Sequence, residues 1–138
     1  LEFDLGLARE QSEKNPVFYL QYAHARICSI FEKARREDIR IDEDADYSLL
    51  NYKSEIDLIK QLLKFPEKVK DACEKADPPI ITEYLRETAQ AFHIFYHECR
   101  IIGVDDNLMQ ARFKLAKVTR TVMKNGLSIL GVKAPEKM

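Results

Sequence analysis

Aromatic and basic side chains share one ridge of a segment that has helical periodicity. The ridge residues recur at three- and four-residue spacing: Tyr19, Tyr22, Arg26, Ser29 and Lys33. An apolar series that begins at Leu20 repeats this spacing one residue later, so the two series form parallel lines about 100° apart around one helix. The tyrosines and bases therefore lie beside the expected core face.

A second segment has the same arrangement. One residue after its apolar positions Phe92, Phe95 and Cys99 come His93, Tyr96 and Arg100. An aromatic ring again stands about one helical turn from an arginine. Planar tyrosine and arginine side chains stack on unpaired bases, which is how proteins commonly recognise RNA loops.

The C-terminal part of the sequence is basic, although the whole chain has a net charge of -1. From residue 107 to residue 138 a single acid, Glu136, stands among the bases Arg112, Lys114, Lys117, Arg120, Lys124, Lys133 and Lys137. Such a surface attracts phosphates without reading sequence. The ridges and this surface together favour single-stranded RNA as a ligand. On pattern alone the tyrosines could equally be half-buried, and Lys114, Lys117 and Lys124 could form an ordinary solvated face.

No constellation of residues points to catalysis or to a metal site. The sequence lacks Glu-x-x-His, a glycine-rich phosphate loop and a nucleophile elbow. Its histidines, His24, His93 and His97, are expected to pack or to lie on the surface. The cysteines, Cys28, Cys73 and Cys99, are far apart and without a Cys-x-x-Cys pair, so we expect three small buried hydrophobic residues in a reducing cytoplasm.

Length and composition predict one folded domain. The 138 residues fit a single core, and 46% hydrophobic with 33% charged residues describe an ordinary soluble surface. No apolar run reaches the roughly 20 residues that span a bilayer, and the start of the chain carries no export signal. Because the chain begins at Leu1 without a methionine, we expect it to be a piece of a longer protein.

The elements that must position the two ridges are predicted to be helices, in an all-α bundle of about five. They are expected at residues 15–36 (Asn15 as cap), 54–63 (Ser54 as cap), 66–76, 79–101 and 107–131 (capped by Asp105 or Asn107). The predicted buried stripes are Leu20, Ala23, Ile27, Ile30 and Ala34; Ile56, Ile59, Leu62 and Leu63; Val69, Cys73 and Ala76; Ile81, Leu85, Thr88, Phe92, Phe95 and Cys99; and Leu108, Ala111, Leu115, Val118, Val122 and Ile129.

Four ordered blocks of the sequence carry a resemblance to a known family. Residues 15–27 read Asn-Pro-Val-Phe-Tyr-Leu-Gln-Tyr-Ala-His-Ala-Arg-Ile, and the other blocks are residues 65–67, 95–100 and the C-terminal group 125–127, 130–132 and 134–138. Together they resemble the DALR-type anticodon-binding domain at the C-terminal end of arginyl-tRNA synthetases. Residues 3–5 are similar to the segment that leads out of the catalytic domain of that family.

The resemblance implies both a function and a set of contacts. Residues 1–14 would be the exit segment from a catalytic domain, and residues 15–138 would hold the anticodon arm of the tRNA for arginine. The catalytic domain, with its ATP and Mg²⁺, would lie outside this chain, which by itself would not be catalytic. Tyr19, Tyr96 and Met138 match positions where the family touches the anticodon loop. Tyr22, Arg26 and Arg100, with Lys114, Lys117 and Lys124, are candidates for RNA or interdomain contacts.

Two alternatives remain at this stage. A non-catalytic paralogue could use the same helices as a protein-interaction module, and it would keep core residues such as Leu20 and Ile27 while losing Tyr19, Tyr96 and Met138. All three are present. A sister synthetase with a related helical domain, such as the cysteine enzyme, is disfavoured by the block at residues 19–26. Gly126 and Gly131 are expected to be structural, the first allowing helices to approach and the second ending a helix.

Overall fold

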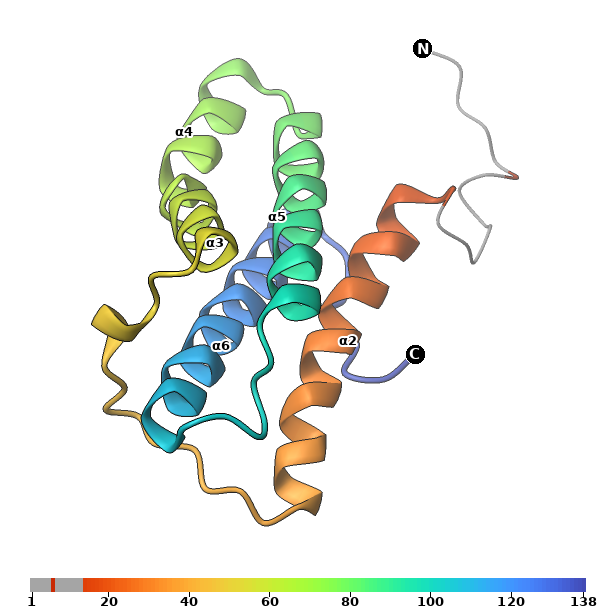
Figure 1. The fold of residues 1–138 in the computed structure, drawn as a ribbon. Helices are drawn as coiled ribbons and strands as arrows, with labels where there is room; N and C mark the ends of the chain where they lie inside the picture. Colours follow the sequence, from red (N-terminus) through yellow and green to blue (C-terminus); the bar gives the residue numbers. More distant parts are fainter. Residues whose placement is uncertain (1–5, 7–13) are drawn as a thin grey trace.

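The computed structural model of the protein describes Gly6 and residues 14–138. The regular structure in this part of the chain consists of five α-helices and a short 3₁₀ helix (Figure 1). Their bounds are α2 Pro16–Arg36, η1 Tyr47–Leu49, α3 Lys53–Leu63, α4 Phe65–Lys75, α5 Pro79–Glu98 and α6 Asp106–Ile129. The predicted all-α bundle is confirmed. The expected exit segment, residues 1–14, lies outside the described residues except for Gly6 and Lys14.

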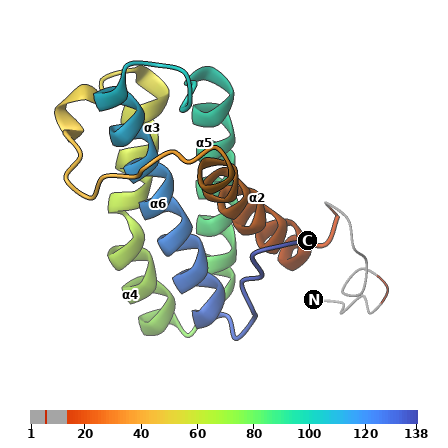
Figure 2. The same cartoon turned by 90° about the horizontal axis from the view of Figure 1, so that it is seen from below.

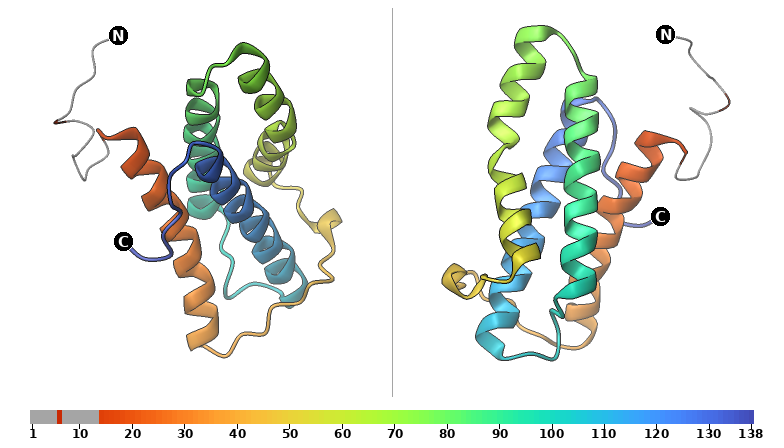
Figure 3. Two further views of the ribbon diagram at one scale, coloured as in Figure 1. Left: turned by 180° about the vertical axis from the view of Figure 1, so that it is seen from behind. Right: turned by 45° about the horizontal axis from the view of Figure 1, so that its top comes forward.

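Helix α5 contacts each of the other four α-helices of the described chain. Helices α3 and α4 follow one another along one side of α5, separated only by Lys64, while α2 lies along the other side (Figure 3). Helix α6 packs against α5, α2 and α3, as the view from below shows (Figure 2). No helix of the described residues is both long and apolar enough to cross a membrane.

Two of the helix starts follow the predicted capping chemistry. The side chain of Asn15 accepts hydrogen bonds from the backbone N–H groups of Val17 (3.1 Å) and Phe18 (3.4 Å), and Pro16 occupies the first helical position. Asp105 likewise accepts from the N–H of Asn107 at 3.2 Å. The helix that carries the first ridge, α2, and the basic helix α6 therefore begin from capped ends.

The start of α3 differs from the prediction that Ser54 caps this helix. Helix α3 begins at Lys53, and the backbone N–H of Tyr52 donates to the carboxylate of Glu55 at 3.0 Å. Ser54 is buried, with its hydroxyl 3.4 Å from the sulfur of Cys99. A carboxylate in the first turn also complements the positive end of the helix, so it can replace the expected serine cap.

Part of the predicted core was wrong. Ile56, Leu63, Val118 and Ile129 are exposed, and so are Cys73 in α4 and Ala76, which follows this helix. The buried residues of α3 are Ser54, Glu55, Leu58, Gln61 and Leu62, and those of α6 include Phe113, Ala116, Thr119, Met123 and Leu127. Helix α5 ends at Glu98 instead of Ile101, although Cys99 and Ile101 are still buried beyond it.

Hydrogen-bonded polar side chains explain the errors in α3 and α6. The amide nitrogen of Gln61 donates to the hydroxyl of Thr88 at 3.2 Å, and the hydroxyl of Thr119 donates to the carbonyl of Leu115 at 2.8 Å. A polar group with such a partner can be buried at little cost. A search for apolar residues alone therefore places the centre of the buried face incorrectly in α3 and α6.

A buried ion pair joins three elements at one end of the bundle. Arg112 of α6 donates from Nε to Glu55 of α3 at 2.8 Å and from Nη1 to the carbonyl oxygen of Arg100 at 2.6 Å. Glu55 is buried, and Arg112 is nearly so. Removing one partner of such a pair leaves a buried charge and costs about 3–5 kcal/mol. Arg112, counted above among the basic surface residues, thus holds the segment that carries Arg100.

Gly126 allows α6 to approach α5 closely, as predicted. A Cβ atom at this position would lie 2.5–2.9 Å from the side-chain atoms of Leu85. Leu85 is completely buried in the core. Its side chain therefore has little room to move away, and a larger residue at position 126 would force the two helices apart.

We predict that Gly126→Ala destabilises the protein by about 1–3 kcal/mol, the usual cost of overpacking a core. The measurement is urea unfolding followed by circular dichroism. Asn125→Ala, at the exposed neighbouring position, is the matched control and should be neutral or slightly stabilising because alanine favours helix. Equal unfolding midpoints for Gly126→Ala and the parent would contradict the close approach.

Candidate functional site

The two aromatic and basic ridges meet in a groove between α2 and α5. Its lining includes Tyr19, Tyr22 and Arg26 from α2 and His93 and Tyr96 from α5, over an apolar floor of Ala23, Ile27, Ala89 and Phe92. The groove has a volume of about 170 Å³. Residues separated by about 70 positions in the sequence are thereby placed on one surface. The structure thus brings together five of the polar and aromatic ridge residues singled out in the sequence.

The tyrosines of the groove are partly supported and partly open to solvent. Tyr22 is 44% exposed and Tyr96 is 39% exposed. The ring of Tyr96 lies nearly parallel to that of the buried Phe92, with centroids 6.0 Å apart and planes 12° apart. The guanidinium carbon of Arg26 lies 5.9 Å from the centre of the Tyr22 ring. These planar groups are held in place and remain accessible, as stacking on a ligand requires.

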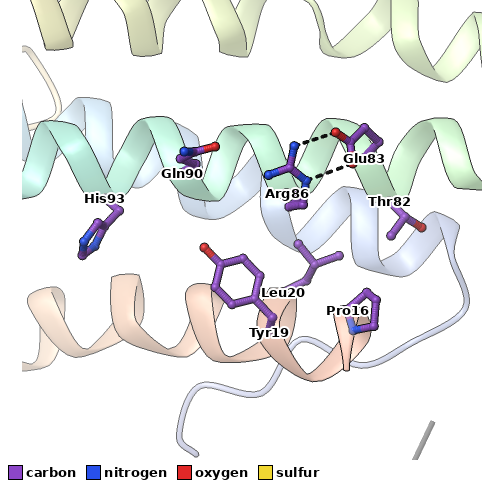
Figure 4. Close-up of a pocket in the computed structure, with 8 residues that line it drawn as sticks. All are labelled: Pro16, Tyr19, Leu20, Thr82, Glu83, Arg86, Gln90 and His93. Carbon is purple, nitrogen blue, oxygen red and sulfur yellow. Dashed lines mark hydrogen bonds and ion pairs between the residues drawn. The ribbon is translucent and has the colours of Figure 1, made fainter. Parts of the chain in front are cut away.

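The groove continues at both ends into larger hollows. Tyr19 and His93 also line a hollow of about 580 Å³ with Arg86 and Gln90 (Figure 4). Tyr96 also lines a hollow of about 470 Å³ at the opposite end of the groove, which includes Lys33 and Arg100. The groove shares Tyr19 and His93 with the first hollow and Tyr96 with the second, and the three neighbouring spaces along α2 and α5 are together called the channel. Four of its lining residues are basic: Arg26, Lys33, Arg86 and Arg100.

Arg86 and Glu83 form a two-pronged ion pair at the edge of the larger hollow. Nε of Arg86 donates to Glu83 at 2.9 Å and Nη2 donates at 2.6 Å, as drawn in Figure 4. The hydrogen bonds from Arg86 hold the pKa of the Glu83 carboxyl below its ordinary value. The sequence analysis did not select either residue. The signal was nevertheless present, because Arg86 and Gln90 continue the ridge of His93, Tyr96 and Arg100 at helical spacing.

Met138 does not line the groove formed by Tyr19 and Tyr96. Gly131, with a φ of 77°, ends α6, and the chain then turns back beside α2 (Figure 1). The side chain of Gln21 donates to the carbonyl oxygen of Lys133 at 2.8 Å. Nδ1 of the buried His24 lies 3.0 Å from the carbonyl oxygen of Pro135. At about 100° per residue, this flank of α2 is turned away from the flank of Tyr19 and Tyr22. An RNA contact by Met138 stays a prediction.

The lysines of α6 form a separate group. Lys117 contacts Glu43 at 2.7 Å and Lys114 contacts it at 3.4 Å. Hydrogen bonds from Lys117 and then Lys114 lower the pKa of the exposed Glu43. Lys124 is exposed on the same helix. The lining of the α2–α5 channel includes none of these three lysines. Their contact with RNA is therefore not supported by this channel and stays a prediction.

The histidines and cysteines differ in burial. His24 is buried, whereas His93 and His97 are exposed. Cys99 is buried as predicted and Cys28 is half-buried, but Cys73 is exposed and the prediction for it was wrong. Burial raises the pKa of the Cys28 and Cys99 thiols, which lowers their reactivity at neutral pH. The described residues contain no group of three or more His, Cys, Asp or Glu that could hold a metal ion.

These features define a class of protein: an all-helical domain with a channel lined by aromatic and basic residues. The model of the family "DALR anticodon binding domain" matches residues 20–138. The chain therefore belongs to the DALR anticodon-binding domain family.

Two curated relatives are arginine–tRNA ligases. The arginine–tRNA ligase of Salinibacter ruber is 54% identical over the whole chain, and that of Caldanaerobacter subterraneus is 49% identical. The chain spans only 25% of the length of each of these curated relatives.

Two solved structures that resemble this chain also carry the name arginyl-tRNA synthetase. A Campylobacter jejuni structure proposed to be an arginyl-tRNA synthetase matches all of this chain, and 30% of its own, with a TM-score of 0.84 and 33% identity. The Thermus thermophilus arginyl-tRNA synthetase matches 87% of this chain, and 21% of its own, with a TM-score of 0.78 and 30% identity.

We predict that Glu43→Gln lowers stability at pH 7, and that this difference disappears as the pH falls. The pKa of Glu43 is lower in the folded protein than in the unfolded chain, where it is about 4.5. The ionised carboxylate therefore stabilises the fold at pH values above 4.5, and this stabilisation is lost as the pH falls through the pKa of the folded protein. Urea unfolding midpoints of parent and variant between pH 7 and pH 3 test this. High salt should also reduce the difference, because the pair is exposed. A difference that persists at pH 3 would show that Glu43 acts by packing.

Proposed function

We propose that the channel between α2 and α5 binds the anticodon arm of the tRNA for arginine. The observation that supports this most is the convergence of Tyr19, Tyr22 and Arg26 with Tyr96 and Arg100 along one channel, in a chain of an anticodon-binding family. The tyrosines stack on unpaired bases of the loop, and the arginines contact phosphates or stack in turn. An anticodon loop offers both kinds of group within a short stretch.

The choice of the arginine tRNA rests on the relatives and on the genetic code. The similar proteins are named arginine–tRNA ligases. Every arginine codon has G at its middle position, so the middle anticodon base is always C, whereas the outer positions vary. A domain that serves all arginine tRNAs should therefore be strict at the middle base and tolerant beside it.

The rest of the reaction is assigned to a longer parent protein. We propose a cytoplasmic ligase that joins arginine to its tRNA with ATP and Mg²⁺ bound in a separate catalytic domain. This proposal rests on the relatives, which are arginine–tRNA ligases and of which the chain spans only 25%. The part of this chain is to hold the tRNA so that its acceptor end reaches that domain.

The alternative, a protein-interaction domain, has less support. Tyrosine and arginine also occur in protein interfaces, so the composition of the channel fits both readings, and membership of an anticodon-binding family supports RNA. A paralogue that had lost its RNA would have no reason to keep Tyr19, Tyr22 and Tyr96 together at one groove. This combination favours the RNA-binding function.

We predict that Tyr96→Ala weakens binding of an arginine anticodon stem-loop by about 1–3 kcal/mol, the usual effect of removing one base-stacking ring. Tyr96→Phe should keep most of the affinity, because the phenyl ring still stacks. Titrations with the stem-loop measure the affinity of both variants. They need low salt, because the stem-loop lacks the contacts of the rest of the tRNA and its binding weakens steeply as salt rises. Thermal melts should change much less than binding, because the ring is partly exposed.

Tyr47→Ala is the matched control for this experiment. Tyr47 is 53% exposed and lies in η1, and it does not line the channel. It should bind the stem-loop like the parent. The stacking role is excluded if Tyr96→Ala binds like the parent, or if it melts as early as a core truncation that costs about 3–5 kcal/mol.

A further inference from the structure

The hollow at the N-terminal ends of α2 and α5 has the size and the chemistry of a nucleobase site. Its volume of about 580 Å³ is within the roughly 300–1,000 Å³ of small-molecule sites. Tyr19 projects from α2 toward α5, and Arg86, Gln90 and His93 line the α5 side (Figure 4). An aromatic ring beside a guanidinium and an amide is a common setting for an unpaired base, which needs a stacking surface and partners for its edge.

Glu83 fixes the orientation of Arg86 and leaves part of its guanidinium available. The two hydrogen bonds to Glu83 use Nε and one hydrogen of Nη2. The two hydrogens of Nη1 and the second hydrogen of Nη2 form no hydrogen bond with any other described residue. Nη1 and Nη2 therefore still offer two parallel N–H groups, and a planar fork of this kind suits two adjacent acceptor atoms.

Cytosine presents such acceptors on its Watson–Crick edge. Its O2 and N3 atoms accept, and its N4 amino group beside them donates. Uracil carries N3–H in the same place, which would oppose an N–H of Arg86. The side-chain oxygen of Gln90, one turn further along α5, is suited to accept from the cytosine amino group.

We propose that Arg86, held in position by Glu83, is a specificity-determining residue that reads cytosine at the middle of the anticodon. The inference rests on the proposed function, which supplies the requirement for C at that position. Tyr19 stacks on the base, and Gln90 accepts from its amino group. Arg86 and Tyr96 are ten residues apart, or roughly 15 Å along the helix axis, so they contact different nucleotides of one loop.

An ordinary surface ion pair provides the matched comparison. Glu32 and Arg35 of α2 have the same spacing and the same two-pronged geometry, at 3.1 Å and 2.6 Å. The side chain of Arg35 is 75% exposed and lies outside the channel, whereas that of Arg86 is 49% exposed and lines the hollow. If Arg86 only strengthened its helix, the two arginines would be interchangeable in every RNA measurement.

The test uses four anticodon stem-loops that differ only at the middle base, C, U, A or G, titrated at low salt against the parent, Arg86→Lys, Glu83→Gln and Arg35→Lys. The parent should prefer C over U by roughly 5- to 150-fold, the range for one bidentate base contact. Arg86→Lys keeps the charge but loses the fork, so the preference should fall to within about twofold. Glu83→Gln should reduce the preference in part, and Arg35→Lys should leave it unchanged.

Each other result contradicts a different part of the account. If Arg86→Lys keeps the preference for C, Arg86 does not read the base, while the tyrosine channel still stands. Preference for G by the parent would overturn the assignment to cytosine, since guanine also has two adjacent acceptors, O6 and N7. Equal binding of all four loops, weakened by Tyr96→Ala, would sink only the inference about Arg86. Absence of binding to every loop would overturn the proposed function and this inference with it.

Discussion

The close packing of α5 against its neighbours is the constraint on which the other features depend. Helix α5 contacts α2, α3, α4 and α6, and at Gly126 the backbone of α6 comes too near Leu85 to admit a side chain. One face of α5 is buried in this core and consists of Tyr84, Leu85, Thr88, Phe92 and Phe95. The next face, about 100° around the helix, faces the edge of α2 and carries the channel residues. Rigid burial of the first face therefore fixes the geometry of the second.

The helices were largely predictable from local chemistry. The pair Asn15 and Pro16 correctly predicted the start of α2. The helical spacing of apolar residues from Ile81 to Cys99 correctly predicted the buried face of α5. Prediction failed where burial depends on partners distant in sequence. Glu55 is buried because Arg112, 57 residues later, neutralises it, and Gln61 because Thr88 accepts its hydrogen bond. No local pattern marks such a polar residue as part of the core, so the faces of α3 and α6 were misplaced.

The site was predictable in its residues more than in its extent. Helical phase alone indicated that Tyr19, Tyr22 and Tyr96 stand beside the core, and the structure places them on one groove. The same phase places Arg86 on this ridge, but the sequence analysis did not select it, because an arginine paired with a glutamate one turn away resembles any exposed helix pair such as Glu32–Arg35. The basic count of the C-terminal part was also misleading, since Arg112 is structural and Lys114 and Lys117 contact Glu43.

The central claim is that RNA lies along α2 and α5, and mapping of backbone amide shifts by NMR tests it most directly. An arginine anticodon stem-loop is added at low salt, and a fully paired duplex of the same length serves as the control. The account predicts the largest shifts around Tyr19, Tyr22, Arg86, His93 and Tyr96, and their absence with the duplex, which has no unpaired bases. Shifts confined to α6 around Lys114 and Lys117, or the same shifts with the duplex, would contradict it.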